Sequence, residues 1–278
     1  MQHDLRQMLQ QECYGKALEQ RKHWYSAAAD AYDQVRPRYP SGVIRQVAQC
    51  ANLSQRSTLL EIGCGPATAT TAFAPLVGTI LALEPNPQFW AIAQRNCNAY
   101  PHVAIRNCAF EEWSLMPQTF DAVVAASSLH WIAPEVAYPK IAAALQPEGC
   151  LILLWNKELQ PSYEMHQELS QVYQAYAPAL DRYEDPATQF AMVDAMGQMA
   201  VESGYFRNIL VGHEVVETNY STEQYLMLLQ TYSPFLKLDP DTQARLIEAL
   251  RQVLASHGDR IALSWVSAFH VAQPVRVG

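Results

Sequence analysis

Two glycines and an acidic residue carry the clearest chemical signal in this sequence. Gly63 and Gly65 stand between a short apolar run, residues 58–62, and a helix-like segment, residues 67–75. Glycine allows a tight turn and a close approach to a ligand that a Cβ atom would prevent. The first N–H groups of the following helix are free to bind polar ligand atoms. Glu84 ends the next apolar run, where a carboxylate can accept hydrogen bonds from both hydroxyls of a ribose. The pattern therefore predicts a nucleotide-binding turn.

Two classes of cofactor compete for this turn. The dinucleotide motif G-x-G-x-x-G needs a third glycine at position 68, where this chain has Thr68. That motif also usually has an apolar residue where this chain has Glu61. A carboxylate there suits a ligand with an ammonium group, such as the methionyl part of S-adenosylmethionine. The loop therefore favours S-adenosylmethionine, and a nicotinamide dinucleotide stays open as the alternative.

His130 is the candidate catalytic residue. Methyl transfer from a sulfonium is an in-line displacement, in which alignment of the reactants supplies much of the rate. A base is needed only where the acceptor arrives protonated, so a carboxylate acceptor needs none. His130 follows the fourth apolar run, where sheets of this kind place their sites, and it could act as that base. A structural histidine packed beside Trp131 is the alternative.

Short apolar runs alternate with helical stretches between residues 58 and 155. The runs are too short for buried helices and mostly lack alternation, which is typical of strands covered on both faces. Strand–helix alternation predicts a parallel sheet with right-handed crossovers. The runs cover residues 58–62, 79–83, 103–105, 122–126 and 150–155, and the helical stretches cover residues 67–75, 89–99 and 134–145.

The flanking segments are predicted to be mainly helical. Apolar spacing predicts a helix over residues 1–31, and Pro37 and Pro40 prevent its continuation into a second helix capped by Ser41. We expect a single domain over residues 1–278 with a cofactor-binding core at 42–158. Three helical segments would cover the acceptor pocket, and two late strands would complete the sheet. These are residues 1–41, 159–204 and 221–258 for the cover, and 205–220 and 259–272 for the strands.

Composition excludes several classes of function. The chain has 19 Lys and Arg against 27 Asp and Glu, and no basic run longer than Arg21-Lys22, so nucleic acid is not the expected partner. Its 6 cysteines form no C-x-x-C pair, which predicts free thiols in a reducing compartment and no metal site. No run approaches the about 20 apolar residues that a membrane span needs, and the first residues lack a signal-peptide core. We therefore expect a cytoplasmic protein without a membrane partner.

The stretch from about residue 32 to 155 resembles the class I S-adenosylmethionine-dependent methyltransferases. It is most similar to the bacterial group of trans-aconitate methyltransferase-like proteins, the methyltransferase type 11 group. Six ordered motifs carry the resemblance, and together they are far more specific than any one of them. They are AYD (31–33) with RPRYP (36–40), EIGCG (61–65), EPN (84–86), FEEW (110–113), FDAV (120–123) leading to SLHW (128–131), and LQPEG (145–149).

The resemblance implies a Rossmann-like α/β fold: a doubly wound, seven-stranded, mostly parallel sheet whose last strand is antiparallel, with helical elaborations at both termini. It also implies S-adenosylmethionine as the cofactor. On this resemblance the cofactor-binding residues are Glu61, Gly63 and Gly65 at the methionyl group, Glu84 at the ribose, Phe110 and Glu111 at the adenine, and Ser127 and Ser128 near the sulfonium.

Three residues near the first prolines are expected to close over the cofactor or to hold an anionic substrate: Tyr32, Arg36 and Tyr39. The alternative is that they only form a helix-end turn stabilised by prolines. Trp131 is expected as a wall of the acceptor pocket, and Trp155, Tyr232 and Ser233 are added to it. The favoured function is methylation of a small molecule. A nicotinamide oxidoreductase and a non-catalytic cofactor-binding protein of the same fold stay open, because fold alone does not settle function.

Overall fold

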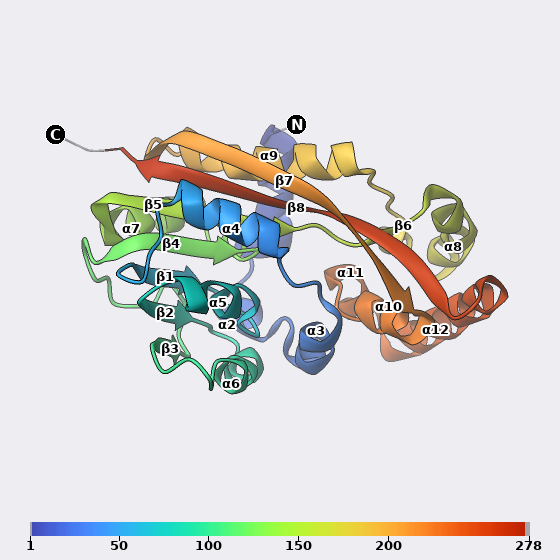
Figure 1. The fold of residues 1–278 in the computed structure, drawn as a ribbon. Helices are drawn as coiled ribbons and strands as arrows, with labels where there is room; N and C mark the ends of the chain where they lie inside the picture. Colours follow the sequence, from blue (N-terminus) through green and yellow to red (C-terminus); the bar gives the residue numbers. More distant parts are fainter. Residues whose placement is uncertain (1, 276–278) are drawn as a thin grey trace.

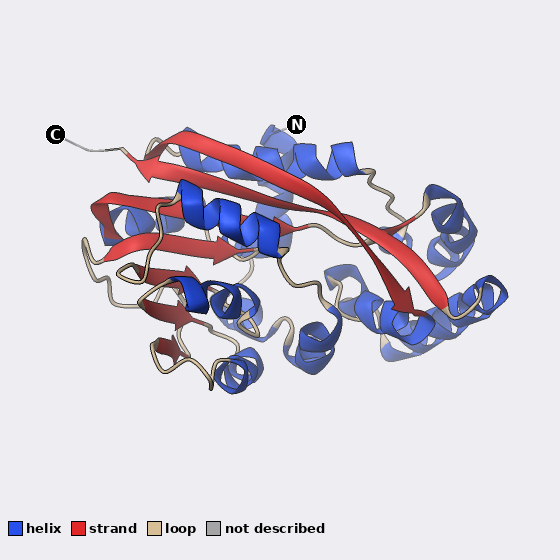
Figure 2. Cartoon of the chain, viewed as in Figure 1, coloured by secondary structure: helices blue, strands red, loops and turns tan. Residues whose placement is uncertain are grey.

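The computed structural model describes residues 2–275, which form one sheet with helices on both faces (Figures 1 and 2). The sheet order is β3-β2-β1-β4-β5-β8, with β7 on the outer side of β8. β8 runs antiparallel to β5 and β7, and the other main pairings are parallel. The strands are β1 (Thr58–Ile62), β2 (Thr79–Leu83), β3 (Val103–Arg106), β4 (Phe120–Ala126), β5 (Leu145–Asn156), β7 (Phe206–Ser221) and β8 (Arg260–Pro274). The predicted doubly wound sheet is confirmed.

An eighth strand, β6 (Gln160–Pro161), adds to the seven that were predicted. It pairs with β8 at Ser264 and Leu263, just beyond the register positions where β5 pairs with β8. β6 therefore continues the line of β5 after a short break. The sequence gives no signal for it, because two residues are too few for a periodic pattern.

Helices cover both faces of the sheet, and alternate strand residues pack against opposite layers. Leu59 and Leu60 are neighbours in β1 and both are fully buried, but they belong to different apolar clusters. A run that is apolar at every position is what a sheet covered on both faces requires. One face carries α4 (Ser41–Cys50), α5 (Thr68–Phe73) and α6 (Pro87–Asn96), and the other carries α1 (Gln2–Leu9), α7 (Pro134–Ala144) and α9 (Pro186–Glu202).

A third group of helices gathers where β7 and β8 extend beyond the rest of the sheet (Figure 1). It has its own apolar cluster, which includes Leu263 and Trp265 of β8. Its members, called the lid helices below, are α8 (Tyr163–Tyr176), α10 (Thr222–Leu229), α11 (Ser233–Leu236) and α12 (Pro240–Leu254). α9 packs instead against β7 and β8, so this part of residues 159–204 covers the sheet.

The N-terminal segment is broken where the sequence predicts one helix. After α1 come a π-helical turn (Gln10–Tyr14), α2 (Leu18–His23), a 3₁₀ turn (Ser26–Ala28) and α3 (Ala29–Val35). Gly15 closes the π-helical turn by donating its N–H to the Gln10 carbonyl at 2.9 Å, and a Cβ atom there would lie 2.0 Å from that oxygen. The predicted cap at Ser41 is also wrong. Pro40 precedes the helix without a side-chain cap, and the Ser41 hydroxyl accepts from Arg45 instead.

Further 3₁₀ turns lie at Ala74–Leu76, Leu129–Trp131, Pro178–Leu180 and Ala255–His257. Among the residues that the structure describes, no helix has the length and apolar character needed to cross a membrane.

Candidate active site

A cavity lies at the carboxyl ends of the parallel strands, where β1 separates the two halves of the sheet. This topological switch point is where open α/β sheets bind their ligands. Most predicted site residues line the cavity: Tyr32, Arg36, Tyr39, Gly63, Gly65, Glu84, Phe110, Glu111, Ser127, Ser128 and Trp131. Segments far apart in the sequence therefore meet at one edge of the sheet.

The loop between β1 and α5 forms one wall of the cavity. Gly63 has φ +63°, and a Cβ atom there would lie 2.9 Å from the Ser128 Cβ. Gly65 has φ +56°, and a Cβ atom added there would meet no other atom within 4 Å, so this side of the loop faces open space. Ala67 also takes the left-handed conformation, with φ +70°. Left-handed backbone is favoured mainly by glycine, and these three residues turn the chain from β1 into α5.

Glu84 organises one side of the cavity. Its Oε2 accepts from the Gly65 N–H at 2.7 Å and its Oε1 accepts from the Asn86 N–H at 2.8 Å. The side chain is 4% exposed, and burial raises its pKa to about 7 against the effect of these two hydrogen bonds. A carboxylate has about four lone-pair sites, so each oxygen can accept one more hydrogen bond.

Glu61 lies behind the glycine loop and does not line the cavity directly. Its Oε2 accepts from the Thr70 hydroxyl at 2.6 Å, whereas its Oε1 is buried without a hydrogen-bond partner. Burial, with a smaller contribution from the charge of Glu84, raises the pKa of Glu61 to about 8. An unpaired buried carboxylate is costly, so this site is suited to a nearby cation.

The loop after β3 forms the opposite wall. Phe110 is 2% exposed and stacks on Trp113 with the ring centroids 6.0 Å apart. Lys140 of α7 holds this turn by donating to the carbonyls of Phe110 at 2.7 Å, Glu111 at 3.1 Å and Trp113 at 2.6 Å. Glu111 is tied to Arg21 of α2 by an ion pair of 2.7 Å.

Two serines after β4 form the floor. Ser127 has φ +52°, and its hydroxyl lies 3.3 Å from the Tyr39 hydroxyl. The Ser128 hydroxyl donates to the Ile62 carbonyl and so ties the end of β4 to the end of β1. Asn156, the last residue of β5, also lines the cavity and donates its side-chain N–H to the Pro37 carbonyl at 3.1 Å.

Arg36 joins the N-terminal segment to the lid helices. Its Nε and Nη2 donate to the hydroxyl and the carbonyl of Thr231, each at 2.8 Å. The guanidinium lies 4.9 Å from the Tyr32 ring and 4.3 Å from the Tyr232 ring. Among residues 2–275 no carboxylate lies within ion-pair distance of Arg36, although the charge of Glu158 acts on it from farther away, and Arg36 lines the cavity.

His130 and Trp155 are placed differently from the prediction. They lie outside the cavity, in a separate small cavity among apolar residues, with their ring centroids 6.0 Å apart. His130 Nδ1 and Trp155 Nε1 are both buried without a hydrogen-bond partner. Burial and the charge of Lys157 lower the pKa of His130 to about 4. A general base must reach the proton that it removes, and the structure does not give His130 that position.

Tyr232 and Ser233 also lie outside the cavity lining. The Tyr232 hydroxyl accepts from the Leu159 N–H at 3.1 Å, and its ring supports Arg36. The Ser233 hydroxyl accepts from Trp24 Nε1 at 3.1 Å and lies 2.9 Å from the Tyr25 hydroxyl. Both residues therefore act on the cavity through neighbours.

Several lining residues were missed by the sequence reasoning: Arg21, Lys22, Tyr25, Asn156 and Lys157. Lys140, which holds the wall without lining the cavity, was missed as well. Arg21-Lys22 was visible only as the longest basic run, and the others have no local pattern. Within the described part of the chain, no group of three or more His, Cys, Asp or Glu residues could hold a metal ion.

Comparison with known proteins agrees with this geometry. A family model described as a methyltransferase domain matches residues 60–153, which run from β1 through most of β5. An uncharacterized methyltransferase of Mycobacterium tuberculosis is 26% identical over 235 residues, covering 84% of this chain and 86% of the relative. The matches give no support to the nicotinamide alternative.

Solved structures show the same fold. A candidate type II methyltransferase from Anaeromyxobacter dehalogenans gives a TM-score of 0.62 at 19% identity, covering 86% of this chain and 97% of that one. Phosphoethanolamine N-methyltransferase 2 of Haemonchus contortus, with S-adenosylhomocysteine bound, gives a TM-score of 0.52 at 15% identity, covering 92% of this chain and 59% of that one. The match to the methyltransferase-domain model and the similarity to the mycobacterial methyltransferase, together with the glycine loop and the acidic residue after β2, identify the chain as a class I S-adenosylmethionine-dependent methyltransferase.

Proposed function

We propose that this enzyme methylates a small molecule bound beside Tyr39, Asn156 and Lys157. The observation that carries the proposal is the cover over the cavity. Leu18, Tyr25 and Arg36 come from the N-terminal segment and line the cavity, and this segment is bonded to the lid side through Thr231 and Ser233. A protein or nucleic-acid acceptor needs an open surface, whereas a small molecule can be enclosed and stripped of water.

The residues of the cavity fit S-adenosylmethionine. We propose that Gly63 and Gly65 pass under the methionyl group, whose ammonium would compensate the unpartnered oxygen of Glu61. Arg36 has a free side toward the cavity and would bind the methionyl carboxylate. Glu84 would accept from the ribose hydroxyls through its remaining lone pairs. Phe110 and Glu111 would border the adenine.

Chemistry at this site needs alignment more than proton transfer. S-adenosylmethionine supplies a methyl group on a sulfonium, and its thioether leaves without charge. No histidine lines the cavity among the described residues, and burial raises the pKa of the Tyr39 hydroxyl well above its usual value of 10. We therefore propose an acceptor atom that reacts without a protein base, such as a carboxylate oxygen. Tyr39 and Ser127 would orient it.

The proposal can be tested with S-adenosylmethionine that is isotopically labelled in its methyl group. The enzyme is incubated with small carboxylates, amines and thiols, and in parallel with protein and RNA fractions. Label should enter a small molecule. With a carboxylate acceptor and saturating S-adenosylmethionine, turnover should be flat with pH between about 6 and 9, because the methyl-transfer step requires no ionisation. Label that enters only protein or RNA would refute the proposal.

A pair of tyrosine variants tests the location of the acceptor. Tyr39→Phe removes the hydroxyl beside Ser127 and should lower turnover or raise KM for the acceptor, with little change in S-adenosylhomocysteine affinity. Tyr163→Phe is the matched control, because Tyr163 is 52% exposed and lies in α8 outside the cavity lining. Equal kinetics for the two variants would move the acceptor away from Tyr39.

A further inference from the structure

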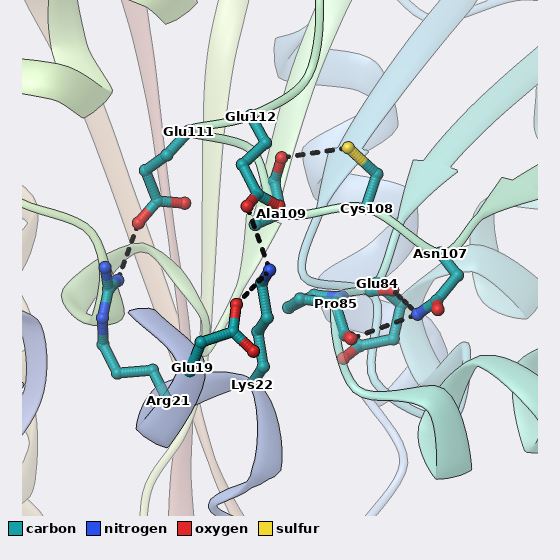
Figure 3. A network of polar contacts seen from close by, with 10 residues as sticks. All are labelled: Glu19, Arg21, Lys22, Glu84, Pro85, Asn107, Cys108, Ala109, Glu111 and Glu112. Carbon is teal, nitrogen blue, oxygen red and sulfur yellow. Dashed lines mark hydrogen bonds and ion pairs between the residues drawn. The ribbon is translucent and has the colours of Figure 1, made fainter. Parts of the chain in front are cut away.

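The basic pair Arg21-Lys22 bridges the adenine end of the cavity. Both residues belong to α2, and with Leu18 and Tyr25 they line the cavity opposite the ends of β2 and β3. Figure 3 shows α2 facing the loop that contains Ala109, Glu111 and Glu112, with both basic side chains pointing toward it. Residues about 90 positions apart in the sequence are thus joined across the cavity.

Two ion pairs make this connection. Arg21 Nη1 lies 2.7 Å from Glu111 Oε1, and the same nitrogen donates to the Trp131 carbonyl. Lys22 Nζ lies 3.0 Å from Glu112 Oε1 (Figure 3). The Arg21–Glu111 side chains are 13% and 20% exposed, whereas Glu112 is 48% exposed. The Arg21 pair is therefore the stronger connection, because partly buried charges are less screened by solvent.

Apolar packing contributes little to holding α2 in place. The helix has six residues, and none of them is buried. On its C-terminal side, Trp24 and Tyr25 are bonded to Ser233 through polar atoms. Segments with few buried apolar contacts open at a lower free energy than the core. The position of α2 thus depends on its polar contacts.

We propose that Arg21 and Lys22 form a latch that closes the adenine end of the cavity and sets the rate at which S-adenosylhomocysteine leaves. This inference rests on the proposed orientation of the cofactor, with its adenine beside Phe110 and Glu111. Arg21 acts as a positioning residue, since it joins α2 to the wall after β3 and to the turn after β4 at once. Release of the product requires the Arg21–Glu111 pair to separate, and that pair re-forms over the next cofactor molecule.

Arg21→Met tests the latch, because methionine keeps much of the apolar stem and removes the charge. The dissociation rate of S-adenosylhomocysteine, followed by tryptophan fluorescence after rapid mixing, should rise about tenfold, as expected for loss of a charge-assisted contact. The association rate should rise as well, because the Arg21–Glu111 pair is also formed without ligand and must separate before the cofactor enters. Release from the wild type should accelerate with salt, and release from the variant should accelerate less, because the variant lacks the Arg21–Glu111 pair and keeps only the Lys22–Glu112 pair for salt to screen.

Arg251→Met is the matched control. It removes the pair with Glu223 on the lid helices, where the side chains are 41% and 67% exposed and lie outside the cavity lining. Its release rate should equal that of the wild type. Glu111→Gln should reproduce the effect of Arg21→Met, and the double variant should release product no faster than either single variant.

An unchanged release rate in folded Arg21→Met, or additive effects of the two substitutions, would overturn the latch. Because Glu111→Gln breaks the same pair from the other side, a folding defect in one variant still leaves the test with the other. Failure of the wild type to bind S-adenosylhomocysteine would overturn the cofactor site and the latch together. A failure confined to the acceptor screen would leave the latch supported, since its test uses no acceptor.

Discussion

Replacing Glu61 by glutamine removes a buried ionisable group without changing the shape of the side chain. Glutamine can still accept from the Thr70 hydroxyl, which now donates to Oε2 at 2.6 Å. The rise in the pKa of Glu61 from its ordinary value of 4.5 to about 8 corresponds to about 5 kcal/mol of difference between its two protonation states. About 3 kcal/mol of this destabilises the unliganded protein at pH 7.

The sign of the effect follows from proton binding. Between pH 4.5 and about 8 the folded protein holds a proton on Glu61 that the unfolded chain has released. The contribution of Glu61 is therefore most favourable below pH 4.5, and it is lost as the pH rises through 8. Urea unfolding without ligand should show Glu61→Gln gaining stability over the wild type by several kcal/mol between pH 5 and about 8.5.

Ligand binding should lower the pKa of Glu61 again. An ammonium beside Glu61 favours the ionised carboxylate, so binding of S-adenosylhomocysteine at pH 7 should release nearly one proton from this group. Calorimetry in buffers of different ionisation enthalpy should show this release in the wild type and a smaller one in Glu61→Gln, which should also bind more weakly. Parallel stability curves with pH would refute the raised pKa. Equal proton release would show that the ammonium lies elsewhere.

Three further substitutions address the walls of the cavity and the histidine. Glu84→Ala should weaken S-adenosylhomocysteine binding by about one to two decades. It should also lower the unfolding free energy by roughly 2 kcal/mol or more, because the Gly65 and Asn86 N–H groups lose their acceptor. Unchanged calorimetric affinity in folded protein would contradict this role. Lys140→Met should lower the free energy of unfolding in urea by about 2–3 kcal/mol and weaken cofactor binding, because three carbonyls lose a charged donor. A change in stability without a change in cofactor affinity would show that Lys140 does not act on the site. His130→Asn should keep turnover and cofactor affinity at pH 7.5. The variant should lose less stability than the wild type as the pH falls from 6.5 toward 4, since the lowered pKa of His130 makes protonation of the wild-type histidine costly. A turnover loss of about 100-fold with intact affinity would instead support His130 as a base.

The cofactor half of the fold could be predicted from sequence because its signals are local. Each of the five apolar runs, and the loop around Gly63 and Gly65, is only a few residues long. A strand that is buried on both faces appears in the sequence as a continuous apolar run. Glu84 follows from the same logic, because a polar residue that ends such a run stands at the edge of the sheet.

Side-chain direction could not be predicted in the same way. His130 lies in a 3₁₀ turn after Ser127, whose positive φ redirects the chain, so no periodicity fixes where its ring points. Along β5, Trp155 and Asn156 must face opposite sides, but the sequence does not say which side opens on the cavity. The break at Gly15 was equally hidden, since it depends on a turn that closes on the Gln10 carbonyl.

The residues proposed to bind the cofactor and those that cover the cavity come from different parts of the chain. The family model covers residues 60–153, which hold the glycine loop and Glu84, whereas Arg36, Thr231 and Ser233 lie outside that match. These outer residues meet only in the folded protein, through the bonds of Arg36 to Thr231 and of Tyr25 to Ser233. Under the proposed function, the space left for an acceptor would be set by long-range pairs between the N-terminal segment and the turn that contains Thr231 and Ser233. Exchanging residues 15–39 and 221–236 together with those of a relative, rather than either alone, should therefore transfer acceptor preference while cofactor affinity stays with the core.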